Sequence, residues 1–208
     1  HSIRRQRQMC IRDSSYMTIS GGFGKLVLGE LDGVTDAYGI AATDLPAEEI
    51  YVGEPADMVT ENADAASAGG ESNKVSYHIP AVGGLTGGIS FTNSGAAGDA
   101  DATEYGLKYA MDAGGAAVTI GASTGTKDVS GAQDQDHQVI GVSITSGAMT
   151  VNLSQATYED ADQNEETNGA AAKFALGNGM TLDGYTTKLE EDLASSGEEG
   201  ITTFKPGI

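Results

Sequence analysis

The sequence has a single cysteine, Cys10, no tryptophan and only four prolines in 208 residues. One cysteine excludes an intrachain disulfide framework and any zinc site built from several cysteines. Aromatic residues make up only 6% of the chain. A conventional core would therefore have to be packed mostly from Ala, Val, Leu and Ile, and the material for it is thin.

Basic residues and long hydrophobic runs are also scarce. Eleven Lys and Arg stand against thirty Asp and Glu, which gives a net charge of −19. Such a field repels nucleic acids, so we expect no nucleic-acid partner. No run of about 18 apolar residues occurs, which excludes a membrane-spanning helix. Membrane proteins built from strands also lack such runs, so a membrane-spanning β-barrel is not excluded.

Apolar and polar residues alternate with a period of two in many parts of the chain. In the stretch EYGLKYAMD, for example, Tyr105, Leu107, Tyr109 and Met111 alternate with small or charged residues. This pattern predicts strands with one apolar face. The clearest cases are residues 73–79, 104–112, 117–123, 139–145 and 149–155.

The connections between these strands alternate in length. Short Gly-rich turns are expected near 81–86, 113–115, 146–148 and 177–179, and long acidic loops at 93–103, 125–136, 158–168 and 190–200. Hairpins standing side by side, with tight turns at one end and long loops at the other, are typical of outer-membrane β-barrels. A soluble antiparallel sandwich or meander gives the same alternation and is the alternative.

Two stretches resemble a known family. GGFGKLVLGELDG (residues 21–33) and NKVSYHIPAVGGLTGGISFTNSG (residues 73–95) resemble the general trimeric porins of Gram-negative bacteria, most of all those of α-proteobacteria. The resemblance implies an all-β fold, an antiparallel transmembrane β-barrel of sixteen strands in the parent protein, assembled as a homotrimer in outer-membrane lipid. This chain, over residues 15–208, would supply about nine to ten strands as a partial barrel.

The resemblance also implies that residues 35–72 form a loop that folds into the pore and narrows it. This segment holds nine acids and no Lys or Arg. The function that the resemblance implies is that of a porin for passive diffusion of small hydrophilic solutes and ions. Carboxylates in a confined aqueous passage favour cations, so we expect this porin to prefer cations. The candidate constriction residues are Glu30, Asp44, Glu48, Glu49, Glu54, Asp57, Glu61 and His78.

Two of these candidates, Glu30 and His78, stand where relatives often carry a basic residue. Glu30 conflicts with strict alternation, because an inward Glu30 would also turn Leu26 and Leu28 inward and Lys25 toward lipid. A bulge or a place at the trimer interface would reconcile them. The alternative for the whole acidic segment is a solvated surface loop.

Nothing in the sequence predicts catalysis or a cofactor. The stretch that begins at Asp160 resembles an EF-hand loop, but Glu165 stands where glycine is needed and Ala171 where the bidentate glutamate belongs. Weak binding of divalent cations such as Ca²⁺ by the acidic loops stays open. The competing functions are a secreted acidic β-rich surface or adhesin-type binding domain and a soluble β-protein of a salt-adapted organism.

The first fourteen residues, HSIRRQRQMCIRDS, contain every arginine of the chain. A basic arm would suggest contact with nucleic acid or lipid, yet the strand pattern begins only at Tyr16–Ser20. RRQRQ and MCIRDS resemble translated sequencing-adapter read-through, so we predict that residues 1–14 are foreign. With an end in mid-strand, the chain is then expected to be an internal fragment.

Overall fold

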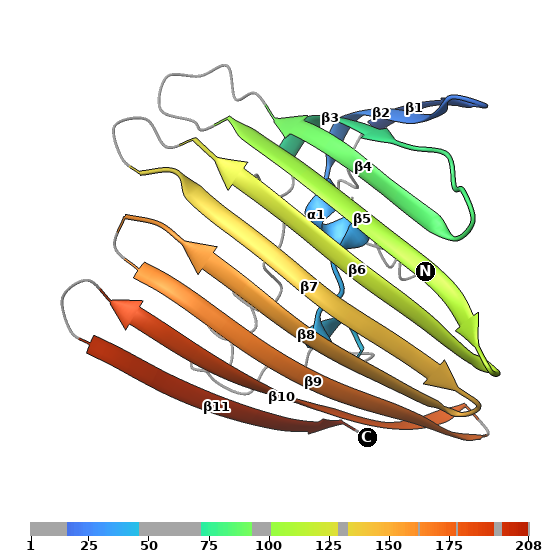
Figure 1. The fold of residues 1–208 in the computed structure, drawn as a ribbon, viewed down its shortest axis with the longest axis vertical. Coiled ribbons are helices and arrows are strands. Elements are labelled where there is room, and N and C mark those ends of the chain that lie inside the picture. The colour runs from blue at the N-terminus through green and yellow to red at the C-terminus, as the bar shows by residue number, and fades with distance from the viewer. Residues whose placement is uncertain are drawn as a thin grey trace, which may run out of the picture.

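The computed structural model describes residues 16–45, 72–92, 101–128, 133–161, 163–177, 179–193 and 197–207. Its fold is a single antiparallel sheet of eleven strands in the order of the chain, each strand paired with the next (Figure 1). The strands are β1 Tyr16–Gly21, β2 Gly24–Leu31, β3 Ser72–His78, β4 Leu85–Thr92, β5 Ala102–Ala113, β6 Ala116–Lys127, β7 Gln135–Ser146, β8 Met149–Glu159, β9 Gln163–Gly177, β10 Met180–Leu193 and β11 Gly197–Gly207. Two short helices, α1 Val34–Tyr38 and η1 Ala42–Asp44, follow β2.

The predicted all-β antiparallel class is confirmed, and the sheet has one strand more than the upper limit that the sequence suggested. Gly22 and Phe23 form the turn between β1 and β2. Residues 1–14 and residues 46–71 lie outside the described residues.

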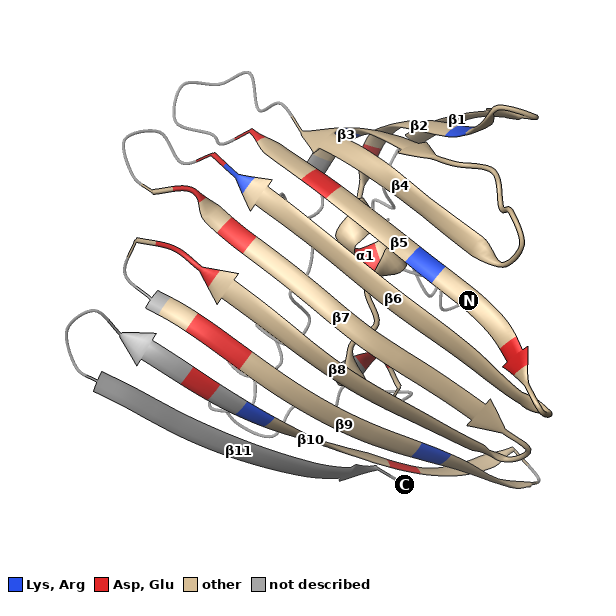
Figure 2. Ribbon diagram, viewed as in Figure 1, with Lys and Arg blue, Asp and Glu red and all other residues tan. Residues whose placement is uncertain are grey.

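Tight turns and wider connections lie at opposite ends of the sheet, as predicted. The β5–β6 turn consists of Gly114 and Gly115, whose φ angles of 68° and 91° favour glycine. The wider connections are shorter than expected because the acidic segments continue the strands: β9 already begins at Gln163 and β10 runs to Leu193. Figure 2 shows acidic residues gathered toward this wider end of the sheet.

The register of the pairs assigns every strand residue to one of two faces. One face carries the exposed apolar side chains, with relative exposures of 54% for Leu107 and 46% for Leu153. The opposite face, called the inner face below, carries mostly small and polar residues and is covered in part by α1, which contacts β4, β5 and β6. The sheet thus has the apolar-out, polar-in alternation of an outer-membrane barrel wall.

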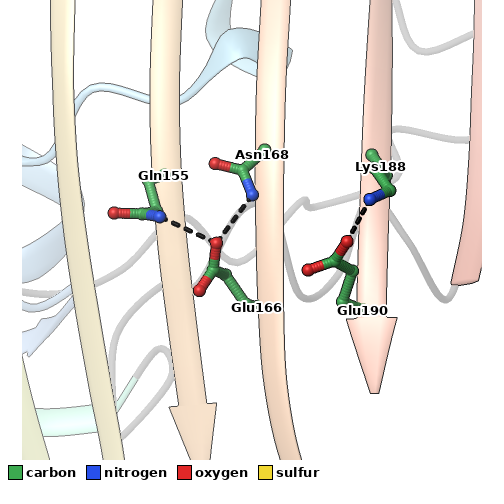
Figure 3. A network of polar contacts seen from close by, with 5 residues as sticks. All are labelled: Gln155, Glu166, Asn168, Lys188 and Glu190. Atoms are coloured by element: carbon green, nitrogen blue, oxygen red, sulfur yellow. Dashed lines mark hydrogen bonds and ion pairs between the residues drawn. The ribbon is translucent and has the colours of Figure 1, made fainter. Parts of the chain in front are cut away.

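The apolar outer band ends at a row of polar residues. Gln155 of β8 pairs with Asn168 of β9, and Asn168 pairs with Lys188 of β10. Figure 3 shows Gln155 and Asn168 each donating a hydrogen bond to a carboxylate oxygen of Glu166, both at 2.8 Å. Lys188 and Glu190 form an ion pair on the neighbouring strand. Such charges are costly in hydrocarbon, so we expect the lipid-facing band to end at this row.

No helix within the described residues is long and apolar enough to cross a membrane.

Candidate functional site

The segment from Gly33 to Leu45 crosses the inner face of the sheet. Its first part, α1, contacts β4, β5 and β6, and its second part, η1, contacts β8, β9 and β10. In Figure 1 the blue ribbon of this segment lies behind the strands, across their direction. Of the predicted loop, residues 35–72, the structure describes residues 35–45, which lie against the inner face of the sheet.

A row of glycines brings the sheet backbone into direct contact with this segment. A Cβ atom added to Gly106 would lie 2.6 Å from the Cβ of Tyr38, and one on Gly121 would lie 2.4 Å from the Tyr38 carbonyl oxygen. Added to Gly141, it would lie 2.0 Å from the Ile40 carbonyl oxygen. Any side chain at these wall positions would push the segment away from the sheet. We call Gly88, Gly106, Gly121, Gly141 and Gly169 the glycine row.

Wall side chains hold the second half of the segment by its backbone. Asn152 Nδ2 donates to the Ala41 carbonyl oxygen at 3.1 Å, and the Ala42 amide donates to Ser154 Oγ at 2.9 Å. Ala42 is fully buried and packs in a small cluster with Ala171 and Tyr185. The short side chains of the segment let its backbone lie flat on the wall.

The middle of the segment is held by Tyr38 and Lys108. The Tyr38 hydroxyl and His78 Nδ1 are 2.7 Å apart and hydrogen-bonded, with ring centroids 5.7 Å apart. Lys108 Nζ donates to the Ala37 carbonyl oxygen at 3.0 Å. His78, a sequence-predicted constriction residue, thus lies on the inner face and contacts the inward segment.

The inward segment carries two exposed carboxylates, Asp36 and Asp44. Desolvation raises the pKa of Asp36, and repulsion from Asp32 and Asp44 raises this pKa further. Desolvation also raises the pKa of Asp44, although the hydrogen bond that Asp44 accepts from the Ala41 amide lowers it in part. A cation beside these carboxylates would lower the repulsion that raises the pKa of Asp36.

Lysines and acids nearly balance on the inner face of the strands. Among the described side chains, the register turns five lysines inward, Lys25, Lys74, Lys108, Lys127 and Lys173, and four acids, Glu104, Asp112, Glu165 and Asp183. An excess of negative charge on this side of the sheet would therefore come from the inward segment and not from the described strands. Within the described ranges, no three His, Cys, Asp or Glu side chains gather as a metal site.

The prediction that Glu30 faces the constriction is wrong. Continuous pairing of β2 with β3 puts Glu30 on the outer face with Leu26 and Leu28, while Lys25 lies inward opposite His78. The alternation that conflicted with an inward Glu30 is kept, without a bulge. Asp44 and His78 lie on the inner side. The other five predicted residues, Glu48, Glu49, Glu54, Asp57 and Glu61, lie outside the described residues.

Sequence reasoning missed Glu104 and the glycine row. Glu104 belongs to a stretch that was read as a strand, and its buried position depends on partners up to 70 residues away. The glycine row had a visible signal: each member occupies an inward position in a different strand from β4 to β9. Reading only the inward positions of successive strands would have revealed it.

The comparisons with known proteins identify the family. The model of the Gram-negative porin family matches residues 6–203. Two structures of OmpT, an outer membrane protein of Vibrio cholerae, are each 12% identical with a TM-score of 0.69 and cover 92% of this chain. They are covered over 63% and 62% of their own length, so this chain spans less than two thirds of them.

A third structure, an anion-selective porin from Comamonas acidovorans, is 16% identical over 93% of this chain and 72% of its own, with a TM-score of 0.47. No curated protein matches the sequence. The predicted resemblance to Gram-negative porins is confirmed by the family match. Because that match takes in nearly the whole sequence, the chain belongs to the Gram-negative porin family and lies in the outer membrane of a Gram-negative bacterium.

Proposed function

We propose that the full-length protein forms a water-filled channel through which small hydrophilic solutes and ions diffuse passively. The observation that carries this proposal is the segment 33–45, which lies across the polar inner face of the sheet and is held there by contacts with β3, β5 and β8. A wall that is apolar outside and polar inside, narrowed by an inserted segment, is suited to sieving solutes in water. No catalytic step is part of the proposal.

Cation preference is the finer part of the proposal. It is supported by the nine acids and absent bases of residues 35–72 and by the place of Asp36 and Asp44 on the inner side. The near balance of charges on the described wall means that this preference depends on the inward segment. The same negative charge would also bind divalent cations such as Ca²⁺ weakly.

The test is a planar-bilayer measurement on the full-length protein. We expect stepwise single-channel conductance and, under a salt gradient, a reversal potential of the sign that indicates cation preference. An anion-preferring potential would refute the selectivity, and the absence of conductance from correctly folded protein would refute the channel itself.

The homotrimer is a further part of the proposal, supported by the family to which the chain belongs. We expect the full-length protein to migrate as a trimer in detergent before boiling and as a monomer after it. A monomeric species under mild detergent, with the fold intact by circular dichroism, would contradict the trimer.

A further inference from the structure

Glu104 is the largest of the fully buried side chains in the described part of the chain, with 1% of its surface exposed. It lies on the inner face of β5, where it pairs with Ser90 of β4. A buried carboxylate is costly unless it accepts hydrogen bonds or meets a positive charge. The groups around Glu104 therefore show what the carboxylate is used for.

The carboxylate of Glu104 joins the wall to the inward segment. From the wall, Ser90 Oγ donates to Oε2 at 2.5 Å. From the segment, the Val34 amide donates to the same oxygen at 3.1 Å, and Thr35 Oγ1 donates to Oε1 at 3.3 Å. The Val34 amide also lies 3.1 Å from Ser90 Oγ, so one buried cluster ties β4, β5 and the start of the segment together.

Two neighbouring residues fit this arrangement. A Cβ atom on Gly33 would lie 1.6 Å from Glu104 Oε2, so only glycine allows the chain to pass this close to the carboxylate. Lys74 of β3, 3% exposed, is near enough to interact electrostatically with Glu104 and Asp32. This positive charge offsets part of the cost of burying the carboxylate.

From this geometry we infer that Glu104 is a positioning residue for the channel: it holds residues 33–35 against the wall and thereby sets where the segment enters the pore. The inference rests on the proposed channel function. The strand itself does not depend on this carboxylate, since the backbone of β5 pairs with β6 along its whole length and with β4 over residues 102–109. Loss of the carboxylate should free the segment and leave the sheet in place.

The test compares full-length wild type with Glu104→Ala, Glu104→Gln and Thr35→Val. Glu166→Gln is the matched control, because Glu166 also accepts two hydrogen bonds but lies on the outer face. The first readout is hydrogen exchange of the amides in residues 33–38 relative to those in β6 and β7. The second is the single-channel conductance and its spread between open levels.

We expect Glu104→Ala to speed exchange in residues 33–38 about tenfold or more, since the segment loses hydrogen bonds to a charged group, with β6 and β7 unchanged. Its conductance should differ from wild type and spread over several levels. Glu104→Gln, whose amide oxygen still accepts from Val34 and Thr35, should restore much of both properties. Thr35→Val should give a smaller effect in the same residues and keeps the test valid if Glu104→Ala fails to fold.

Unchanged exchange and conductance in Glu104→Ala, or in Thr35→Val where the alanine variant does not fold, would overturn the inference. Faster exchange throughout β6 and β7 would overturn it too, because it would show a general loss of stability. If wild type itself does not conduct, the proposed function fails, while the exchange measurement still decides whether Glu104 holds the segment.

Discussion

The substitution Gly141→Ala tests whether the inward segment lies directly on the backbone of the wall. The added Cβ would lie 2.0 Å from the Ile40 carbonyl oxygen and 3.0 Å from the Ile40 Cβ. Atoms in real structures do not approach so closely, so the segment must move away from β7. A shift of about 1 Å toward the pore is the least that restores an ordinary contact.

The same shift breaks neighbouring contacts. The bonds from Asn152 to Ala41 and from Ala42 to Ser154, at 3.1 Å and 2.9 Å, would stretch beyond hydrogen-bonding distance. At about 0.5–1.5 kcal/mol for each bond, the segment loses about 1–3 kcal/mol of its attachment to the wall. We therefore expect lower single-channel conductance in Gly141→Ala and faster exchange of the Ala42 amide.

The control for this measurement is Gly22→Ala. Nothing lies within 4 Å of a Cβ built on Gly22, and this residue belongs to the turn before β2, away from the segment. Its conductance and exchange should equal those of wild type. If Gly141→Ala also matches wild type in both measurements, the segment does not rest on the glycine row and the account of the site is wrong.

Four further predictions concern charge and the outer face. The folded-state pKa values of Asp36 and Asp44 are raised above the ordinary 3.8, so on acidification cation preference should begin to fall at a higher pH than it would with free carboxylates. Reversal potentials measured at a series of pH values test this. The double variant Asp36→Asn with Asp44→Asn should lose the part of the pH dependence that these two carboxylates cause. The raised values also mean that these groups favour the folded state fully below pH 3.8 and lose this contribution as the pH rises through the raised pKa, so the double variant should melt at a higher temperature at neutral pH. Glu30→Gln should leave the reversal potential unchanged, and a shift as large as that of Asp36→Asn would refute the outward register. Ile120→Arg places a charge on the outer band, which costs about 2 kcal/mol or more, so a smaller fraction of the protein should fold into vesicles. The inward variant Thr119→Arg should fold into vesicles as wild type does.

The period-two alternation predicted the strands and their faces because lipid and water impose opposite demands on neighbouring residues. It failed at the strand ends. Acids such as Glu165, Glu166 and Glu190 were read as loop residues, but a strand that extends past the hydrocarbon can carry acids on either face. Charged residues in such a place indicate that the strand has entered water, and they do not indicate that the strand has ended.

The two errors at the site have different causes. Glu30 was assigned from its place in a family motif, although the alternation of Leu26 and Leu28 already opposed an inward position; the local pattern was the better guide. Glu104 could not be found from its own surroundings, since its burial depends on residues 33–35 folding back onto β5. Contacts between distant parts of the chain leave no periodic signal in the sequence.

The close fit between the glycine row and the segment also limits how such a pore can be redesigned. A foreign constriction loop with a different path would meet side chains where this one meets bare backbone, or leave gaps over the glycines. The loop and five wall positions on as many strands therefore form one exchangeable unit. Grafting experiments that move both together should succeed where transfer of the loop alone gives a blocked or leaky pore.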